Sequence, residues 1–484
     1  MKKFWFILVL LLIVSIVLQT QLSAHCDLIY MIDSGKRLLT GGTLLKDVFD
    51  PNSPLLFYVS LWVNRLAETL SLSALDVFKC IVYLCVVYSL WMSFKLFPKP
   101  HRQAFILSYA VCLLLLPIDY FTDREHWMIM LTLPYFLLRY QRVEHQNVHA
   151  FTVIIIGAFA ALGFCLKPHF FIPLVLTEAL ILMWRKDWGS LFDPEVLILI
   201  ATSIALTLGS AVQMPGYYND ILPWVMRWYA RNHHPFALFT HTGFFTFVVL
   251  SGCFIFTYRS TSRIEKLLFV ITLGFELAFL LQGKGWFYHM LPIMTYCILL
   301  TTLFICERKR IGYCLFAYIF LIILYPIYCN YVQKVSCYRH HTCTYQPLVR
   351  AIQEHAIPGE SVFFFTTLMS LSIPATYYTH TELGSRFSYL WFIASIVHRQ
   401  QAMHGVCDET CKQATQDAFK YINEDFTRYK PVVVFVKDPH KKPYLYQAFD
   451  YLSFMKGSPE FKTLWKNYRY ERTVDDYDVY LKWK

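Results

Sequence analysis

Ionisable side chains gather at a few points between long apolar runs. Asp27 directly follows the first of these runs, and Asp123-Arg124-Glu125-His126 stands at the edge of another. Lys167-Pro168-His169 interrupts an apolar stretch, and Gly283-Lys284-Gly285-Trp286-Phe287-Tyr288-His289 opens one. A carboxylate can remove the proton of an attacking hydroxyl, and lysine, arginine and histidine can bind phosphate. These residue types are suited to a group transfer in which a phosphate leaves.

Each of these points also has a structural interpretation. Asp27 could cap a helix, and residues 119–126 could form a solvated turn with an internal Arg–Glu pair. A divalent metal site from Asp123, Glu125 and His126 is a further alternative, although three adjacent helical residues cannot all face one ion. Glycines beside Lys284 allow close backbone approach, and amides at a helix start favour an anion. Lys284 and Trp286 could instead anchor a helix at a membrane surface.

The apolar runs must position these residues. The chain has 484 residues, of which 56% are hydrophobic and 16% are charged, whereas a soluble domain carries roughly 25% charged residues. A spanning helix needs about 20 mostly apolar residues. We therefore predict a multi-pass α-helical membrane protein with about eleven transmembrane helices, near residues 4–21, 75–95, 103–118, 127–140, 149–166, 169–184, 194–213, 241–258, 265–282, 288–306 and 311–330.

Basic residues predict the orientation of these helices. With Lys2 and Lys3 inside, alternation places the other basic connections on the same side. These connections contain Lys95, Lys99, Arg102, Arg139, Arg142, Arg185, Lys186, Arg259, Arg263, Lys266, Arg308, Lys309 and Arg310. The net charge of +11 thus reflects topology, and we expect no nucleic-acid partner. The pattern suits a bacterial inner membrane, with an uncleaved first helix and a cytoplasmic N-terminus.

Residues 331–484 differ from the rest, because charge rises and long apolar runs vanish. Residues 361–366 and 431–436 read as buried strands, 468–473 and 477–483 as a final pair, with helices near 346–356, 388–400, 411–427 and 443–456. We predict two domains: a membrane domain, 1–330, with a first outward loop at 22–73, and an outward-facing (periplasmic or extracellular) α/β domain, 331–484.

The cysteines of this second domain suit an oxidising compartment. Cys337 and Cys343 flank a short basic stretch, and Cys407 and Cys411 flank three residues. We favour pairing within each of these two couples, out of three pairings. A zinc site is the rival, although the spacing matches no standard zinc pattern.

The first outward loop resembles that of a known family. Asp27 precedes Leu38-Leu39-Thr40-Gly41, and the stretch Asp47-Val48-Phe49-Asp50-Pro51-Asn52-Ser53-Pro54-Leu55 follows. This pattern is similar to the GT-C glycosyltransferases, in particular bacterial members related to protein mannosyltransferases and lipid A aminoarabinose transferases. Arg124-Glu125-His126 and Gly283-Lys284-Gly285 with Tyr288-His289 are similar to bacterial members as well. Leu28 stands where the family usually carries a second acid.

The resemblance implies an enzyme that moves a sugar from a polyprenyl-phosphate donor to an acceptor at the outer membrane face, with inversion. Asp27 is then the base, and Glu125 positions the acceptor or orients Asp27. Candidate substrate- and lipid-phosphate-binding residues are Asp123, Arg124, His126, Lys167, Lys284, Tyr288 and His289. No cofactor is implied with certainty; a divalent metal remains an alternative. The acceptor could be lipopolysaccharide, another cell-envelope glycan, a glycolipid or a protein.

Three other classes compete. A polysaccharide polymerase or ligase would use basic residues in a large outward loop, as at Arg227 and Arg231. A lipid or solute transporter would explain Lys167 within the apolar region, but transporters often show inverted repeats, and the sequence has none that we can recognise. A non-catalytic scaffold would use residues 331–484 to bind a partner.

Overall fold

The computed structural model describes residues 2–229, 239, 241–441, 445 and 447–483, so Arg231 lies outside the described residues. The chain divides into two compact units, each assembled from separate segments. The helical unit comprises 1–23, 67–213 and 233–339, and the sheet unit comprises 24–66, 214–232 and 340–484. The predicted domain boundary at residue 330 stays a prediction.

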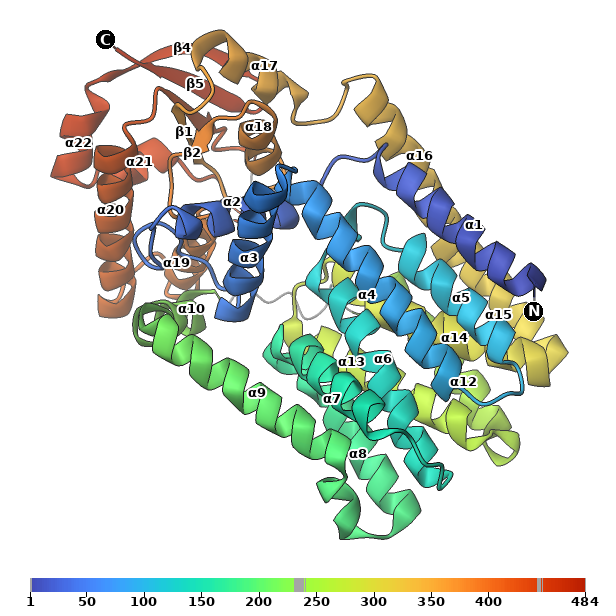
Figure 1. Ribbon diagram of the computed structural model, residues 1–484. Coiled ribbons are helices and arrows are strands. Elements are labelled where there is room, and N and C mark those ends of the chain that lie inside the picture. The colour runs from blue at the N-terminus through green and yellow to red at the C-terminus, as the bar shows by residue number, and fades with distance from the viewer. Residues whose placement is uncertain (1, 230–238, 240, 442–444, 446, 484) are drawn as a thin grey trace. The chain divides into compact units, whose positions relative to one another are not determined.

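The helical unit contains a helix at every predicted apolar run (Figure 1). Its helices are α1 (Lys2–Gln19), α4 (Ala74–Leu96), α5 (Arg102–Leu114), α6 (Arg124–Val143), α7 (Ala150–Cys165), α8 (Phe171–Arg185), α9 (Pro194–Gln213), α12 (Thr242–Thr257), α13 (Arg263–Gln282), α14 (Leu291–Glu307), α15 (Lys309–Ile319) and α16 (Tyr325–Arg339). Within the described residues, seven helical segments are long and apolar enough to cross a membrane. The protein is a multi-helix membrane protein, and the count of about eleven spans stays a prediction.

Buried ion pairs join the ends of three helical segments in this unit. The Arg139 guanidinium of α6 is fully buried, and its Nη2 donates to Glu178 Oε2 at 2.8 Å. Its Nη1 donates to Asp193 at 2.6 Å and to Glu195 at 2.9 Å. Glu195 also pairs with Arg142, and Asp193 also pairs with Arg185. Basic residues that predict the orientation therefore also hold α6, α8 and the start of α9 together.

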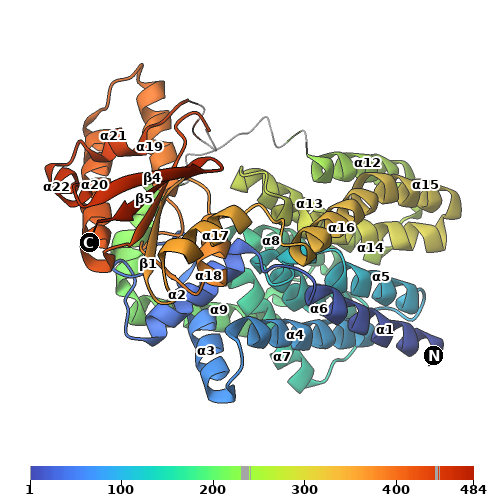
Figure 2. The same cartoon turned by 90° about the horizontal axis from the view of Figure 1, so that it is seen from above.

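The sheet unit contains one five-stranded sheet of order β2-β1-β3-β5-β4 (Figure 2). The strands are β1 (Ser361–Phe365), β2 (Glu382–Leu383), β3 (Val433–Lys437), β4 (Tyr468–Val474) and β5 (Tyr477–Lys482). β1 pairs in parallel with β2 and β3, whereas β5 is antiparallel to β3 and β4. The four predicted strands are present, and the two-residue β2 was not predicted.

Helices cover both faces of this sheet. The helices of the unit are α2 (Cys26–Leu39), α3 (Pro54–Leu70, whose last turn falls in the helical unit), α10 (Leu222–Trp228), α17 (Gln346–His355), α18 (Ser372–Tyr378), α19 (Trp391–Ala402), α20 (Glu409–Tyr429), α21 (Tyr451–Met455) and α22 (Pro459–Trp465). Both views place α17 and α18 on one face of the sheet and α20, α21 and α22 on the other (Figures 1 and 2).

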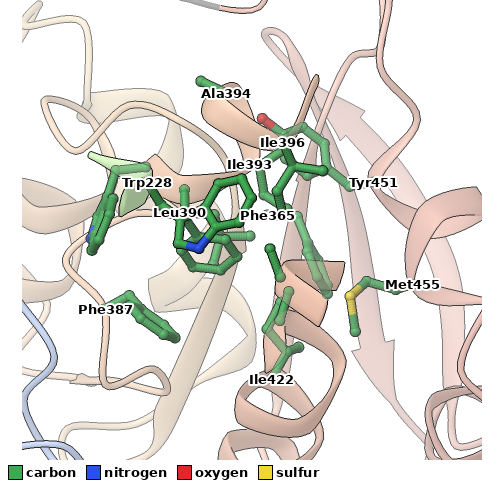
Figure 3. Packing of buried hydrophobic residues seen from close by; sticks show 14 of the residues in the cluster. Trp228, Phe365, Phe387, Leu390, Ile393, Ala394, Ile396, Ile422, Tyr451 and Met455 are labelled. Carbon is green, nitrogen blue, oxygen red and sulfur yellow. The ribbon is translucent and has the colours of Figure 1, made fainter. Parts of the chain in front are cut away.

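The alternation of side chains along β1 explains this layering. Phe363 and Phe365 contact Phe426 of α20, with ring centroids 4.6 and 5.8 Å apart. Figure 3 shows Phe365 in the same cluster as Ile422, Tyr451 and Met455. Phe364, on the opposite face, stacks on Phe435 of β3. Because successive strand residues point to opposite faces, a fully apolar strand requires a helix layer on each side.

Candidate functional site

Asp27 lies in the first turn of α2, in the sheet unit. The helix starts after His25, which has extended backbone angles and no capping side-chain bond. An acid in the first turn of a helix lies at the positive end of the helix dipole and stabilises the helix there. Asp27 is partly exposed, so its carboxylate is accessible. A carboxylate is one of the side-chain groups that can serve as a general base, and the role of Asp27 as the base stays a prediction.

Arg37, at the other end of α2, fixes this helix to the rest of the sheet unit. Its Nε donates to Asp33 at 2.8 Å, within the helix. Its two Nη atoms donate to the carbonyl oxygens of Ser385 at 2.9 Å and Leu383 at 2.5 Å, and to the Tyr429 hydroxyl at 3.2 Å. A guanidinium with this many partners holds α2, and hence Asp27, in one position relative to the sheet.

Close packing of α2 on α3 depends on Gly35. A Cβ atom at Gly35 would lie 2.5 Å from the carbonyl carbon of Ser60 and 2.7 Å from Asn64 Nδ2. Asn64 also donates to the carbonyl of Ile32 at 3.0 Å. The backbones approach so closely that only glycine fits at this position.

We therefore expect Gly35→Ala to destabilise the protein by about 1–3 kcal/mol, because the added methyl group meets backbone atoms that cannot move aside. Gly209→Ala is the matched control, since a Cβ at Gly209 has no neighbour within 4 Å. Thermal unfolding in detergent, followed by intrinsic fluorescence, should show a lower Tm for Gly35→Ala alone. Equal Tm values for the two variants would refute the packing argument.

The two acids of the Asp47–Leu55 stretch hold the first loop in place. The Asp50 carboxylate accepts from the Ser388 hydroxyl at 3.1 Å and from the backbone amide of Asn52 at 2.9 Å. Asp47 forms an ion pair with Arg428 and accepts from the Thr43 amide at 2.7 Å. Both side chains are buried. These acids join residues 43–52 to the segments around 388 and 428.

His25, which precedes α2, could hold a metal ion together with Cys26 and Asp27 of the first turn. The ligand atoms of His25, Cys26 and Asp27 all lie within 4.8 Å of one another. Nitrogen, sulfur and carboxylate donors suit Zn²⁺ better than Mg²⁺. The Asp123, Glu125 and His126 set considered from the sequence does not form such a group among the described residues.

A second group of residues lies in the helical unit, which we call the cationic cluster: Arg124, Glu125, Lys167, His169, Lys284 and His289. The Lys167 ammonium forms an ion pair with Glu125 and lies 3.3 Å from His289 Nε2. His289 Nε2 lies 3.6 Å from Glu125. The charges of Arg124, Lys167 and Lys284 and the His169 ring all act electrostatically on His289. Residues distant in sequence therefore share one site.

The hydrogen bonds of the cluster leave polar atoms without a partner. A lysine ammonium can only donate, so His289 Nε2 accepts and the ring proton lies on Nδ1. Within the described residues, His289 Nδ1, His169 Nε2 and Glu125 Oε2 have no hydrogen-bond partner. Buried polar atoms are nearly always paired. The free Nδ1–H group, beside several cations, is suited to an anionic oxygen.

Lys284 belongs to the loop between α13 and α14. Gly283 and Gly285 on its two sides have φ angles of 65° and 66°. A Cβ at Gly285 would lie 2.6 Å from His241 Nε2. These glycines thus form the tight loop that carries Lys284. Burial lowers the pKa of Lys284 to about 8.

Aromatic rings line the same region. Lys167 lies 5.4 Å from the centre of the Tyr288 ring and 5.7 Å from that of Phe170. Tyr288 contacts the rings of Tyr120 and Trp286. A cation near the face of an aromatic ring is attracted by the ring electrons. Tyr120, Phe170 and Trp286 were not predicted to belong to the site, although each lies in or next to a polar segment of the sequence.

The remaining predicted residues of α6 lie at its start. Asp123 precedes the helix, and its carbonyl accepts from the amides of His126 and Trp127. His126 is fully buried, and its Nδ1 donates to the carbonyl of Phe121. His126 thus fixes the turn before α6. The binding roles of Asp123 and His126 stay predictions.

All four cysteines predicted to form disulfides do so. Cys407 bonds to Cys411, and Cys337 and Cys343 are disulfide-bonded as well. The other ten cysteines, including Cys26, are free.

No family model matches the sequence, and no curated protein sequence is significantly similar. Among solved structures, the chain is similar to ArnT from Cupriavidus metallidurans, bound to undecaprenyl phosphate, with a TM-score of 0.59 and 10% identity over 98% of this chain and 97% of that one. The oligosaccharyltransferase AglB from Archaeoglobus fulgidus, in complex with an inhibitory peptide and a dolichol-phosphate, gives a TM-score of 0.45 and 13% identity over 96% of this chain and 72% of that one. The predicted resemblance to GT-C glycosyltransferases is confirmed at the level of the fold.

Proposed function

We propose that this protein is a membrane glycosyltransferase that takes a sugar from a polyprenyl-phosphate donor and passes it to an acceptor hydroxyl. The observation that carries this proposal is the cationic cluster, in which an unpartnered His289 Nδ1–H group lies among Lys167, Arg124 and Lys284. Such a site favours one phosphate group. The fold shared with ArnT, a protein seen with undecaprenyl phosphate bound, supports a lipid phosphate.

The proposed reaction is a single displacement. The acceptor oxygen attacks the anomeric carbon, and the bond from that carbon to the phosphate oxygen breaks. Asp27 takes the acceptor proton, and polyprenyl phosphate leaves with the bonding electron pair. Cations near the departing phosphate stabilise the charge that develops there. One displacement inverts the anomeric configuration.

Glu125 has a specific place in this proposal. It is fully buried and pairs with Lys167. We assign it the positioning of the Lys167 ammonium, a role that was not predicted from the sequence. Its predicted roles toward the acceptor and toward Asp27 stay predictions.

The proposed setting is a bacterial inner membrane, with the N-terminus in the cytoplasm and both Asp27 and residues 331–484 on the outer side. The distribution of basic residues supports this orientation. The acceptor is a glycan, a lipid such as lipopolysaccharide, or a protein.

Phosphorus NMR of the donor products tests the reaction class. Purified protein with an undecaprenyl-phosphate sugar and a mixed acceptor fraction from the cell envelope should release undecaprenyl monophosphate, and proton NMR should show an inverted anomeric centre in the product. A nucleotide sugar should give no transfer. Transfer from the nucleotide sugar, or retention of configuration, would refute the proposal.

The pKa of Lys284 predicts a pH dependence of donor binding. Only the protonated lysine attracts phosphate, so affinity should be constant below pH 8 and fall as pH rises through about 8. The donor is a phosphodiester whose own charge does not change between pH 6 and 10, so the protein alone accounts for the effect. Equilibrium binding across this range should show the fall in wild type. The Lys284→Arg variant should keep its affinity to at least pH 9, because arginine stays protonated. Identical pH profiles for the two proteins would exclude Lys284 from the site.

A further inference from the structure

The sheet contains a topological switch point between β1 and β3. The chain leaves β1 through α18, on the Phe364 face, and returns to β3 through α20, on the Phe363 face. β2 and β3 thus lie on opposite sides of β1. In open sheets with parallel strands, a crevice forms outside the carboxyl ends of two such strands, and ligands bind there.

A cavity of about 650 Å³ lies at the carboxyl end of β3, one of these two strands. Lys437, the last residue of β3, lines it together with Leu371, which precedes α18. Asp475 and Asp476, in the turn between β4 and β5, form another wall, and Gln346 and Arg350 of α17 line it as well. The cavity has the size of a small-ligand site. Its residues belong entirely to the sheet unit.

One charged group in the cavity wall, the Lys437 ammonium, is buried and forms an ion pair. The Lys437 side chain is only 6% exposed, and its ammonium pairs with Asp476 at 3.2 Å. The same ammonium lies 4.5 Å from the centre of the fully buried Tyr477 ring. Asp476 also pairs with Lys441 at 3.6 Å. Lys437 and Asp476 therefore neutralise each other.

Other groups in the wall remain available to a ligand. Among the described residues, neither the Arg350 guanidinium nor the Asp475 carboxylate forms an ion pair. Both are exposed. The Gln346 amide and the hydroxyls of Thr342 and Thr344 also line the cavity. The site thus offers one free cation, one free anion and several neutral donors and acceptors.

This balance of charges selects the ligand class. A small anion would pair with Arg350 but share the cavity with the unpaired Asp475 carboxylate, and a small cation would pair with Asp475 but share it with the unpaired Arg350 guanidinium. A sugar is neutral, and each hydroxyl can both donate to a carboxylate and accept from a guanidinium or amide. We propose that this cavity is a carbohydrate subsite that holds a saccharide of the acceptor. Only the identification of that saccharide as the acceptor rests on the proposed glycosyltransferase function.

Saturation-transfer NMR on the full-length protein in detergent tests the subsite. The probes are the neutral saccharides maltotriose and tri-N-acetylchitotriose, with inorganic phosphate as the anion probe. The variants are Arg350→Ala and Asp475→Ala, both at exposed positions, and the control is Arg469→Ala, which removes an arginine of β4 outside the cavity. We expect at least one saccharide to bind the wild type and Arg469→Ala equally, and to bind each cavity variant at least tenfold more weakly.

Three results would overturn the proposal: no saccharide in the panel binds the wild type, saccharide binding is the same in the cavity variants, or phosphate binds through Arg350 and displaces the saccharide. Donor hydrolysis, measured in the same preparations, should be unchanged in all variants. Saccharide binding without any donor turnover would retain the carbohydrate subsite and refute the proposed transferase function, so the two failures are distinguishable.

Discussion

Replacing Asp27 with asparagine should lower the rate of sugar transfer about 10²–10⁴-fold, because the amide cannot accept the acceptor's proton. The change keeps the size of the side chain, and Arg37 and Gly35 hold α2 independently of Asp27. Donor binding should therefore stay within about twofold of wild type, and Tm should change little. Initial transfer rates at saturating donor, together with equilibrium donor binding, measure both effects.

Glu382→Gln is the matched control for this experiment. Glu382 is an exposed acid of the same unit, and the part of the chain that the structure describes shows no ion pair for it. The control should transfer sugar at the wild-type rate. Near-normal turnover by Asp27→Asn would exclude Asp27 as the base. Its remaining role would be to stabilise the start of α2 as an acid in the first turn.

Lys167→Met should abolish donor binding and also destabilise the protein by about 3–5 kcal/mol, because Glu125 is left as a buried charge without its partner. The double variant Lys167→Met/Glu125→Gln removes both charges. We expect it to recover most of the lost Tm, since replacing a whole buried ion pair is often neutral. It should still bind no donor. This recovery of stability without recovery of binding distinguishes a phosphate ligand from a purely structural ion pair.

Lys334→Met provides the control for the loss of a lysine. Lys334 pairs with Asp119 in the same unit and lies against the Tyr120 ring, but it is more exposed than Lys167. Its loss should cost little stability and should leave donor binding intact. Donor binding by the double variant at wild-type affinity would remove Lys167 from the proposed site.

The helices and most strands could be predicted because their signals are local. Each apolar run of about 20 residues gave a helix, and the runs around Phe363 and Val434 gave strands. β2 has two residues, too few for a periodic pattern, so its position depends on pairing with β1. The assembly of the sheet unit from three separate segments could not be predicted, because bonds such as those from Arg37 to Leu383 and Ser385 join residues more than 340 positions apart.

The polar residues of the site could be predicted, but their partners could not. Lys167, Glu125 and His289 each stand out as charged or polar groups beside apolar runs, whereas their contacts join residues 42 and 122 positions apart. His126 is likewise a polar residue beside an apolar run, but its ring bonds to the backbone of Phe121. Adjacent residues on a helix point about 100° apart, so a polar tetrapeptide cannot place all its side chains in one site.

Turnover of a labelled lipid donor tests the proposed glycosyltransferase activity. Purified wild-type protein in detergent is incubated with undecaprenyl-phosphate sugars that carry a radiolabel in the sugar, and bound donor and released sugar are both counted. We predict saturable binding of at least one donor, with transfer to an acceptor or slow hydrolysis that leaves undecaprenyl phosphate. Binding of none of these donors, at concentrations well above those in a membrane, would refute the proposed glycosyltransferase function.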